Sequence, residues 1–118
     1  MEVRPRELRR YVTDDGRVPL GEWMDGLRDT RGRAVIAKRL TRMALGNLGD
    51  HKGVGDGVKE LRIDFGPGYR VYFAEHDTTI ILLLCGGDKS TQTADVARAK
   101  VFWAHWKEKN DGKSEEQR

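Results

Sequence analysis

The chain contains almost no cysteine and no long apolar run. Cys85 is the single cysteine among 118 residues, which excludes an intramolecular disulfide. The longest apolar run, Ile80–Cys85, is far shorter than the roughly 20 residues that a membrane-spanning helix needs. The opening residues MEVRPRELRR have no apolar stretch of the kind found in a secretory signal. We therefore expect a soluble, cytoplasmic protein that makes no contact with a membrane.

Motifs for metal and nucleotide binding are also lacking. The three histidines are widely spaced, and neither a Cys-x-x-Cys nor a His-x-x-x-His pair occurs, so we expect no metal and no cofactor. The stretch GGDKST at residues 86–91 resembles a phosphate-binding loop. However, Leu83 and Asp88 stand where the pattern G-x-x-x-x-G-K-[ST] requires glycine. A nucleotide-hydrolysing function is therefore disfavoured.

Charge, in contrast, is abundant and unevenly placed. Charged residues make up 35% of the chain, with a formal net charge of +3. Every ionisable residue in Arg31–Arg42 is basic. A local block of one sign is typical of a surface that binds a polyanion, and a solvated helix face is the alternative. The placement of the charge therefore says more than its modest surplus.

Hydrophobic spacing and turn signals predict one mixed domain at residues 1–109, followed by a disordered tail at residues 110–118. The first expected elements are a strand at 6–13, a short helix with Leu20, Trp23, Met24 and Leu27 on one face, and a second helix at 31–47. A glycine-rich loop at 49–57 follows, and then three antiparallel strands at 58–65, 69–75 and 79–85. A last helix is expected to be capped by Thr91 or Thr93. An aromatic stripe on the last helix, with Trp103 and Trp106, is expected to pack on the sheet.

Strict alternation assigns each residue of the first two antiparallel strands to one face of the sheet. The expected core face carries Leu61, Ile63, Phe65, Tyr69, Val71 and Phe73. The opposite, non-core face carries Arg62, Arg70 and Tyr72. The turn GPG joins these strands, with Pro67 at its second position and Gly68 free to adopt a positive φ.

Arg62 and Arg70 face each other on neighbouring strands, where like charges repel. Such a pair persists more readily if an anion lies between the two side chains. The planar guanidinium binds phosphate oxygens at two points, and Lys89, after the third strand, adds a mobile charge. Tyr72 could stack on a nucleobase beside them. The alternative is a solvated sheet face on which the two arginines pair with nearby carboxylates, namely Glu60, Asp64 or Glu75.

The stretches VKELRIDFGPGYRVYF (58–73) and TIILLLCGGDKSTQTADVARAKVFW (79–103) resemble the RelE/HigB superfamily of toxins from type II toxin–antitoxin modules, and more narrowly the HigB-like addiction-module killer proteins. The resemblance implies an α+β fold, in which two N-terminal helices pack on a mainly antiparallel sheet with a C-terminal helix. It also implies a ribosome-dependent endoribonuclease, an mRNA interferase that needs no metal. In that reaction the 2′-hydroxyl of the RNA attacks the adjacent phosphate.

The resemblance also implies roles for particular residues. Arg70 matches the family's sheet arginine that contacts the scissile phosphate, Arg62 a basic position on the preceding strand, and Lys89 a position that stabilises charge or aids the leaving group. We expect further RNA contacts from Arg31, Lys38, Arg39, Arg42, Lys59 and Tyr72. Where some relatives have a tyrosine on the last helix, Asp95 or its neighbours stand here, so no general base is identified.

The partners implied are mRNA on the ribosome, ribosomal RNA and a cognate helix-turn-helix antitoxin, with operator DNA reached only through the antitoxin. Two other functions stay open. ParE-like toxins share this fold and inhibit DNA gyrase without a catalytic set, and an inactive toxin would only bind its antitoxin. Three basic residues on one face favour the nuclease.

Overall fold

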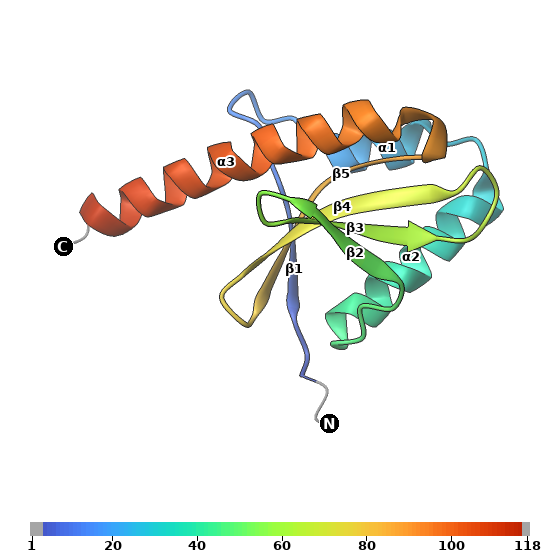
Figure 1. Cartoon of the computed structure of the whole chain (residues 1–118), viewed down its shortest axis with the longest axis horizontal. Helices are drawn as coiled ribbons and strands as arrows, with labels where there is room; N and C mark the ends of the chain where they lie inside the picture. Colours follow the sequence, from blue (N-terminus) through green and yellow to red (C-terminus); the bar gives the residue numbers. More distant parts are fainter. Residues whose placement is uncertain (1–3, 117–118) are drawn as a thin grey trace.

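The computed structural model describes residues 4–116, with side chains as far as residue 110. Within these residues it confirms an α+β protein, with a five-stranded sheet and a long C-terminal helix (Figure 1). The elements are β1 (Glu7–Arg10), α1 (Pro19–Gly26), α2 (Thr30–Ala44), β2 (His51–Gly55), β3 (Val58–Ile63), β4 (Tyr69–His76), β5 (Ile80–Gly87), the 3-10 helix η1 (Lys89–Thr91) and α3 (Gln92–Glu116).

The strand order in the sheet is β1-β5-β4-β3-β2. β1 lies parallel to β5, and the other neighbouring pairs are antiparallel. The predicted meander is confirmed, because β3, β4 and β5 pair consecutively. Its register places Arg62 directly opposite Arg70. The sheet therefore holds the two arginines on one face, next to the turn between β3 and β4.

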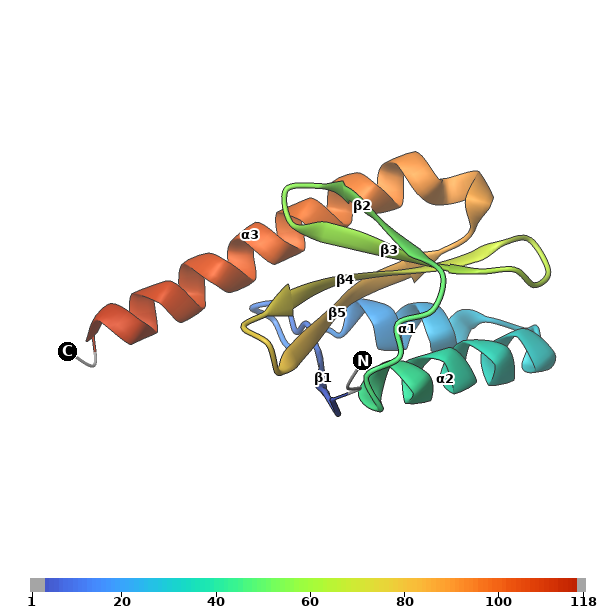
Figure 2. The ribbon, with the colours of Figure 1, turned by 60° about the horizontal axis from the view of Figure 1, so that its bottom comes forward.

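Both faces of the sheet are covered, by helices from different parts of the chain. Figure 2 shows α1 and α2 on one side and α3 on the other. The core on the α1/α2 side includes Leu20, Ile36, Leu40, Met43, Leu61, Ile63, Tyr69, Val71 and Phe73. The core on the α3 side includes Val58, Tyr72, Leu82, Leu84, Ala99 and Trp103. The predicted core face and the aromatic stripe of the last helix are confirmed. The face predicted to be non-core is also buried where α3 lies across it.

The glycine-rich segment at residues 49–57 is not the loop that we predicted. His51–Gly55 forms the edge strand β2, antiparallel to β3, with an irregularity between Gly53 and Gly55. Asp56, with a φ of 56°, and Gly57, with a φ of 86°, turn the chain into β3. Glycine has a low intrinsic preference for strands, so local sequence favoured a loop. The prediction failed because the edge of β3 offers backbone hydrogen bonds to this segment. This pairing outweighs the low strand preference of the glycines.

The helices differ from the prediction mainly at their ends. Thr91 immediately precedes α3, but the side chain that caps this corner is Asp88, which accepts a hydrogen bond from the Ser90 N–H. The α3 backbone continues through residues 110–116, a segment that we had assigned to a disordered tail, and residues 117–118 lie outside the described part of the chain. Within residues 4–116, no helix has the length and apolarity that crossing a membrane would require.

Candidate functional site

The turn between β3 and β4 borders a cavity that is lined by three basic residues. Gly66 and Gly68 adopt φ values of 56° and 79°, which side chains of L-residues rarely allow. The Gly68 N–H donates to the Phe65 carbonyl at 3.1 Å. On the far side of the sheet, the Tyr69 hydroxyl donates to Asp29 at 2.7 Å, the residue that caps α2. The turn is therefore both tight and tied to the helical layer.

A cavity of about 500 Å³ opens beside this turn. Its lining residues are Asp50, Arg62, Ile63, Asp64, Gly66, Pro67, Gly68, Arg70 and Lys89. The three residues that the sequence singled out for catalysis, Arg62, Arg70 and Lys89, thus line one cavity. Two carboxylates accompany the three cations, so the lining has an excess of positive charge. Such a cavity is suited to an anion.

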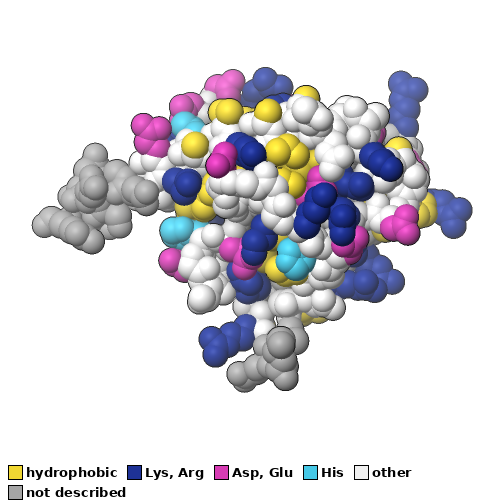
Figure 3. All heavy atoms as spheres, in the orientation of Figure 1, with side chains coloured by type: hydrophobic (Ala, Val, Ile, Leu, Met, Phe, Trp, Pro, Cys, Tyr) yellow, Lys and Arg dark blue, Asp and Glu magenta, His cyan; other side chains and the backbone are white. Residues whose placement is uncertain are grey.

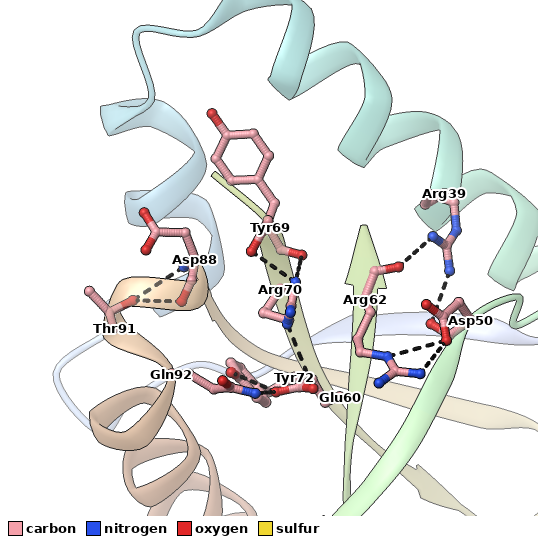
Figure 4. Close-up of polar contacts among 11 residues, drawn as sticks. Arg39, Asp50, Glu60, Arg62, Tyr69, Arg70, Tyr72, Asp88, Thr91 and Gln92 are labelled. Carbon is pink, nitrogen blue, oxygen red and sulfur yellow. Dashed lines mark hydrogen bonds and ion pairs between the residues drawn. The ribbon is translucent and has the colours of Figure 1, made fainter. Parts of the chain in front are cut away.

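Arg70 lies deepest of the three cations, with its side chain 13% exposed. Its Nη1 donates to the carbonyl oxygens of Gly68 at 2.9 Å and Tyr69 at 3.2 Å. Its Nε lies 3.7 Å from Glu60 Oε1 (Figure 4). The alternative prediction named Glu60 as a partner of Arg70, which is confirmed, but it placed the pair on a solvated face, whereas Glu60 is fully buried. The Arg70 guanidinium is held by its own strand and by a buried carboxylate.

Arg62 is bound differently, to a residue outside its own strand pair. Its Nη2 and Nε donate to Asp50 Oδ1 at 2.7 Å and 3.2 Å. The hydrogen bond from Arg62 lowers the pKa of Asp50, and the same bond raises the pKa of Arg62. The side chains are 38% and 56% exposed, so water screens the pair. An anion in the cavity can therefore compete with Asp50 for Arg62.

Lys89 is exposed at the start of η1, where the chain leaves β5. A Cβ placed on Gly68 would lie 3.5 Å from the Lys89 Cβ, so the two backbone segments approach closely at the cavity. Among the described side chains, Lys89 has no ion-pair partner. Its ammonium group is thus the most accessible of the three cations.

Three of the predicted RNA-binding residues have other roles in the structure. Tyr72 is 0% exposed, and burial under α3 raises the pKa of its hydroxyl. The prediction that it stacks on a base is therefore wrong. Arg39 donates to the backbone oxygens of Arg62, Leu48 and Asp50, which fastens α2 to the sheet. Lys59 pairs with Glu75 and, by strand alternation, lies on the opposite face from Arg62.

The other three predicted RNA contacts, Arg31, Lys38 and Arg42, are exposed on α2. They lie outside the cavity lining and form a separate basic surface. In Figure 3, basic side chains are more numerous on the half of the molecule away from the C-terminus, and acidic side chains lie between them. The structure therefore places the three predicted catalytic residues in the cavity, and none of the predicted RNA-binding residues lines it.

Sequence reasoning gave no role to Asp50 or Gln92 and treated Glu60 only as an alternative ion-pair partner. Glu60 is fully buried and accepts hydrogen bonds from Tyr72 and from Gln92 on α3. The one available signal was the position of Glu60 on the same face as Arg62, two residues away on a strongly alternating strand. As for metals, no group of three or more His, Cys, Asp or Glu suited to holding an ion occurs among the residues described.

Comparison with known proteins identifies a related protein that is uncharacterized, so the comparison assigns no activity to this chain. No family model matches the sequence. An uncharacterized protein of Haemophilus influenzae is 49% identical over 80 residues, which are 68% of this chain and 81% of that protein. Identity at this level, over most of both proteins, indicates common ancestry. The chain therefore belongs to the same protein family as this uncharacterized protein of H. influenzae.

Proposed function

We propose that this protein is the toxin of a type II toxin–antitoxin module and acts as a ribosome-dependent mRNA endoribonuclease of the RelE/HigB type. The observation that carries the proposal is the meeting of Arg62, Arg70 and Lys89 in one cavity of about 500 Å³. The arrangement of the helices around the five-stranded sheet is compatible with a RelE-like fold.

The chemistry of the reaction accounts for such a set of cations. The 2′-oxygen of the RNA forms a bond to phosphorus and gives up its proton, while the bond from phosphorus to the 5′-oxygen breaks and that oxygen gains a proton. The products carry a cyclic phosphate and a 5′-hydroxyl. The five-coordinate phosphorane between them carries more negative charge than the substrate. Cations that are already in place stabilise this charge without reorganisation.

Each basic residue fits a different part of that task. Arg70, held by backbone carbonyls and Glu60, presents a fixed guanidinium to the phosphate oxygens. Lys89, exposed and mobile, can approach the departing 5′-oxygen. Arg62 can turn from Asp50 to the phosphate, because an exposed ion pair is weak. Substrate positioning then stands in for a dedicated general base, as Glu60 has no exposed surface.

The partners follow from the same proposal. The exposed surface of Arg31, Lys38 and Arg42 on α2 would contact ribosomal RNA while mRNA enters the cavity. A helix-turn-helix antitoxin would hold the toxin inactive, and operator DNA would be bound through that antitoxin alone.

The test is to induce the chain in bacteria and map mRNA ends by primer extension. We expect new 5′ ends within translated regions for the wild type and for the control Arg9→Ala, which removes an exposed arginine of β1 whose ion-pair partner among the described residues is Glu7. Arg70→Ala, at equal expression, should give none. Growth arrest without new mRNA ends, together with inhibition of gyrase supercoiling by the purified protein, would instead favour the ParE-like function.

A further inference from the structure

Glu60 is a charged residue with 0% exposure, directly behind the cavity. It lies on β3 opposite Tyr72 of β4, and its Oε2 accepts hydrogen bonds from the Tyr72 hydroxyl at 3.1 Å and from Gln92 Nε2 at 2.7 Å. Figure 4 shows these side chains converging on the carboxylate from β4 and α3. One oxygen of Glu60 is therefore fixed by donors from two elements.

Among the described residues, the second oxygen of Glu60 has Arg70 as its ion-pair partner. Glu60 Oε1 and Arg70 Nε are both buried without a hydrogen-bond partner among the described residues, and they lie 3.7 Å apart. A buried charge without a close partner is strongly unfavourable, and replacing a buried ion pair with apolar residues is often neutral or stabilising. Core packing therefore gives no reason for a carboxylate at this position, whereas the guanidinium beside it does.

Some nitrogens of the Arg70 guanidinium contact the protein, and one does not. Nη1 donates to two backbone carbonyls, and Nε faces Glu60. Nη2 has no hydrogen bond to any residue that the structure describes, and it is not among the buried polar atoms that lack a partner. Hydrogen bonds thus hold Nη1, the ion-pair contact with Glu60 orients the Nε side, and Nη2 is left for an anion in the cavity.

We infer that Glu60 is a positioning residue: its buried carboxylate orients the Arg70 guanidinium so that Arg70 binds a phosphodiester in the cavity. Glu60 does not touch the substrate, because it has no exposed surface. Gln92 extends the same network to the first turn of α3, so this helix contributes to the orientation of Arg70. The identity of the ligand, an RNA phosphodiester, rests on the proposed function, whereas the contact between Glu60 and Arg70 does not.

The test compares Glu60→Gln with Glu75→Gln. Both substitutions remove a carboxylate paired with basic side chains, but the partners of Glu75, Arg6 and Lys59, do not line the cavity, whereas Arg70 does. The first measurement is the exchange of the Arg70 Nε–H with water, followed by NMR. We expect slow exchange in the wild type and in Glu75→Gln. Exchange should be about tenfold faster in Glu60→Gln, because the buried ion pair that orients the Arg70 guanidinium is lost.

The second measurement is binding of a short 2′-O-methyl RNA, which its own 2′-oxygen cannot cleave. Glu60→Gln should bind about tenfold more weakly than the wild type, and Glu75→Gln equally well. If Glu60→Gln is folded and neither Arg70 exchange nor RNA binding changes, the inference is wrong. If this variant does not fold, Tyr72→Phe removes one donor to Glu60 and should shift both measurements in the same direction. An unchanged Tyr72→Phe would also overturn the inference.

The two proposals can fail separately. If induction of the wild type produces no new mRNA ends, the proposed function is contradicted, while the exchange of the Arg70 Nε–H still decides whether Glu60 positions Arg70. If the wild type binds RNA and Arg70 exchange is insensitive to Glu60, the proposed function stands and the positioning role is contradicted.

Discussion

The two ends of β4 carry two clusters of charge that are built from the same residue types and differ in one respect. At its far end, Glu75 lies between two cations, Arg6 at 2.7 Å and Lys59. At its beginning, Arg70 meets Glu60 at 3.7 Å. The first cluster uses its carboxylate fully, with both oxygens in ion pairs. The second leaves donors unused at a cavity.

This difference separates a cluster that supports the fold from one that can bind a ligand. Both cations around Glu75 have an ion-pair partner within the protein, because each carboxylate oxygen has its own donor. Around the cavity, in contrast, Lys89 has no ion-pair partner among the described side chains, and the pair of Arg62 with Asp50 is exposed. Arg6 Nε also lacks a hydrogen-bond partner among the described residues, but it is buried. An arginine is therefore a functional candidate only when an unused donor is open to a cavity.

Arg70→Ala gives the largest expected effect. Removal of one preorganised donor at a developing charge should lower the cleavage rate by about 10²–10³ and abolish growth inhibition. Arg70→Lys should also be impaired, because a point charge does not reproduce a planar guanidinium. The measurement is growth after induction, with protein levels and the far-UV circular dichroism spectrum matched to the wild type. Full toxicity of a folded Arg70→Ala variant would contradict the phosphate-binding role.

The double change Lys38→Glu and Arg42→Glu extends the comparison to α2. These side chains are exposed, so we expect them to be available to ribosomal RNA. Losing two phosphate contacts should weaken ribosome binding on the order of tenfold at low salt and flatten its salt dependence. Cosedimentation with ribosomes across a salt series measures both quantities. Unchanged cosedimentation at every salt concentration would show that this surface does not bind the ribosome.

Asp50→Asn tests whether the ion pair with Asp50 keeps Arg62 from binding a ligand in the cavity. Asp50 is the hydrogen-bond partner of Arg62 and lines the same cavity. Removing its charge should strengthen binding of a 2′-O-methyl RNA by roughly threefold, since a competing exposed ion pair is weak. Asp56→Asn is the matched control, because Asp56 is exposed in the β2–β3 turn and does not line the cavity. Weaker binding by Asp50→Asn would mean that Asp50 supports the site.

Glu75→Gln should change stability and leave binding unaltered. Burial raises the pKa of Glu75, but the hydrogen bonds from Lys59 and Arg6 outweigh it and hold the pKa below its ordinary value. A depressed carboxyl pKa stabilises the fold above the pKa of the unfolded chain, and this contribution is lost as the pH falls through the folded pKa. We expect a loss of about 1–2 kcal/mol at neutral pH that disappears in acid. Urea unfolding at both pH values measures it.

The sequence predicted the meander and the shared face of Arg62 and Arg70 because both follow from alternation. Alternation is a local property: successive side chains of a strand point to opposite faces, whatever covers them. The tight turn was equally local, since Gly68 requires a positive φ. The exposed basic positions of α2 followed from helical periodicity. Each of these features depends on residues close together along the chain.

Contacts between distant segments decided the remainder. The glycine-rich segment became β2 because β3 offered a free edge, and Tyr72 became a core residue because α3 crosses its face of the sheet. The same crossing placed Gln92 against Glu60, at a separation of 32 residues. By itself, the sequence determined which side chains share a face and which positions carry charge. Only the tertiary structure decided which charges are neutralised inside the protein and which remain for a ligand, because ion pairing depends on which side chains meet in space.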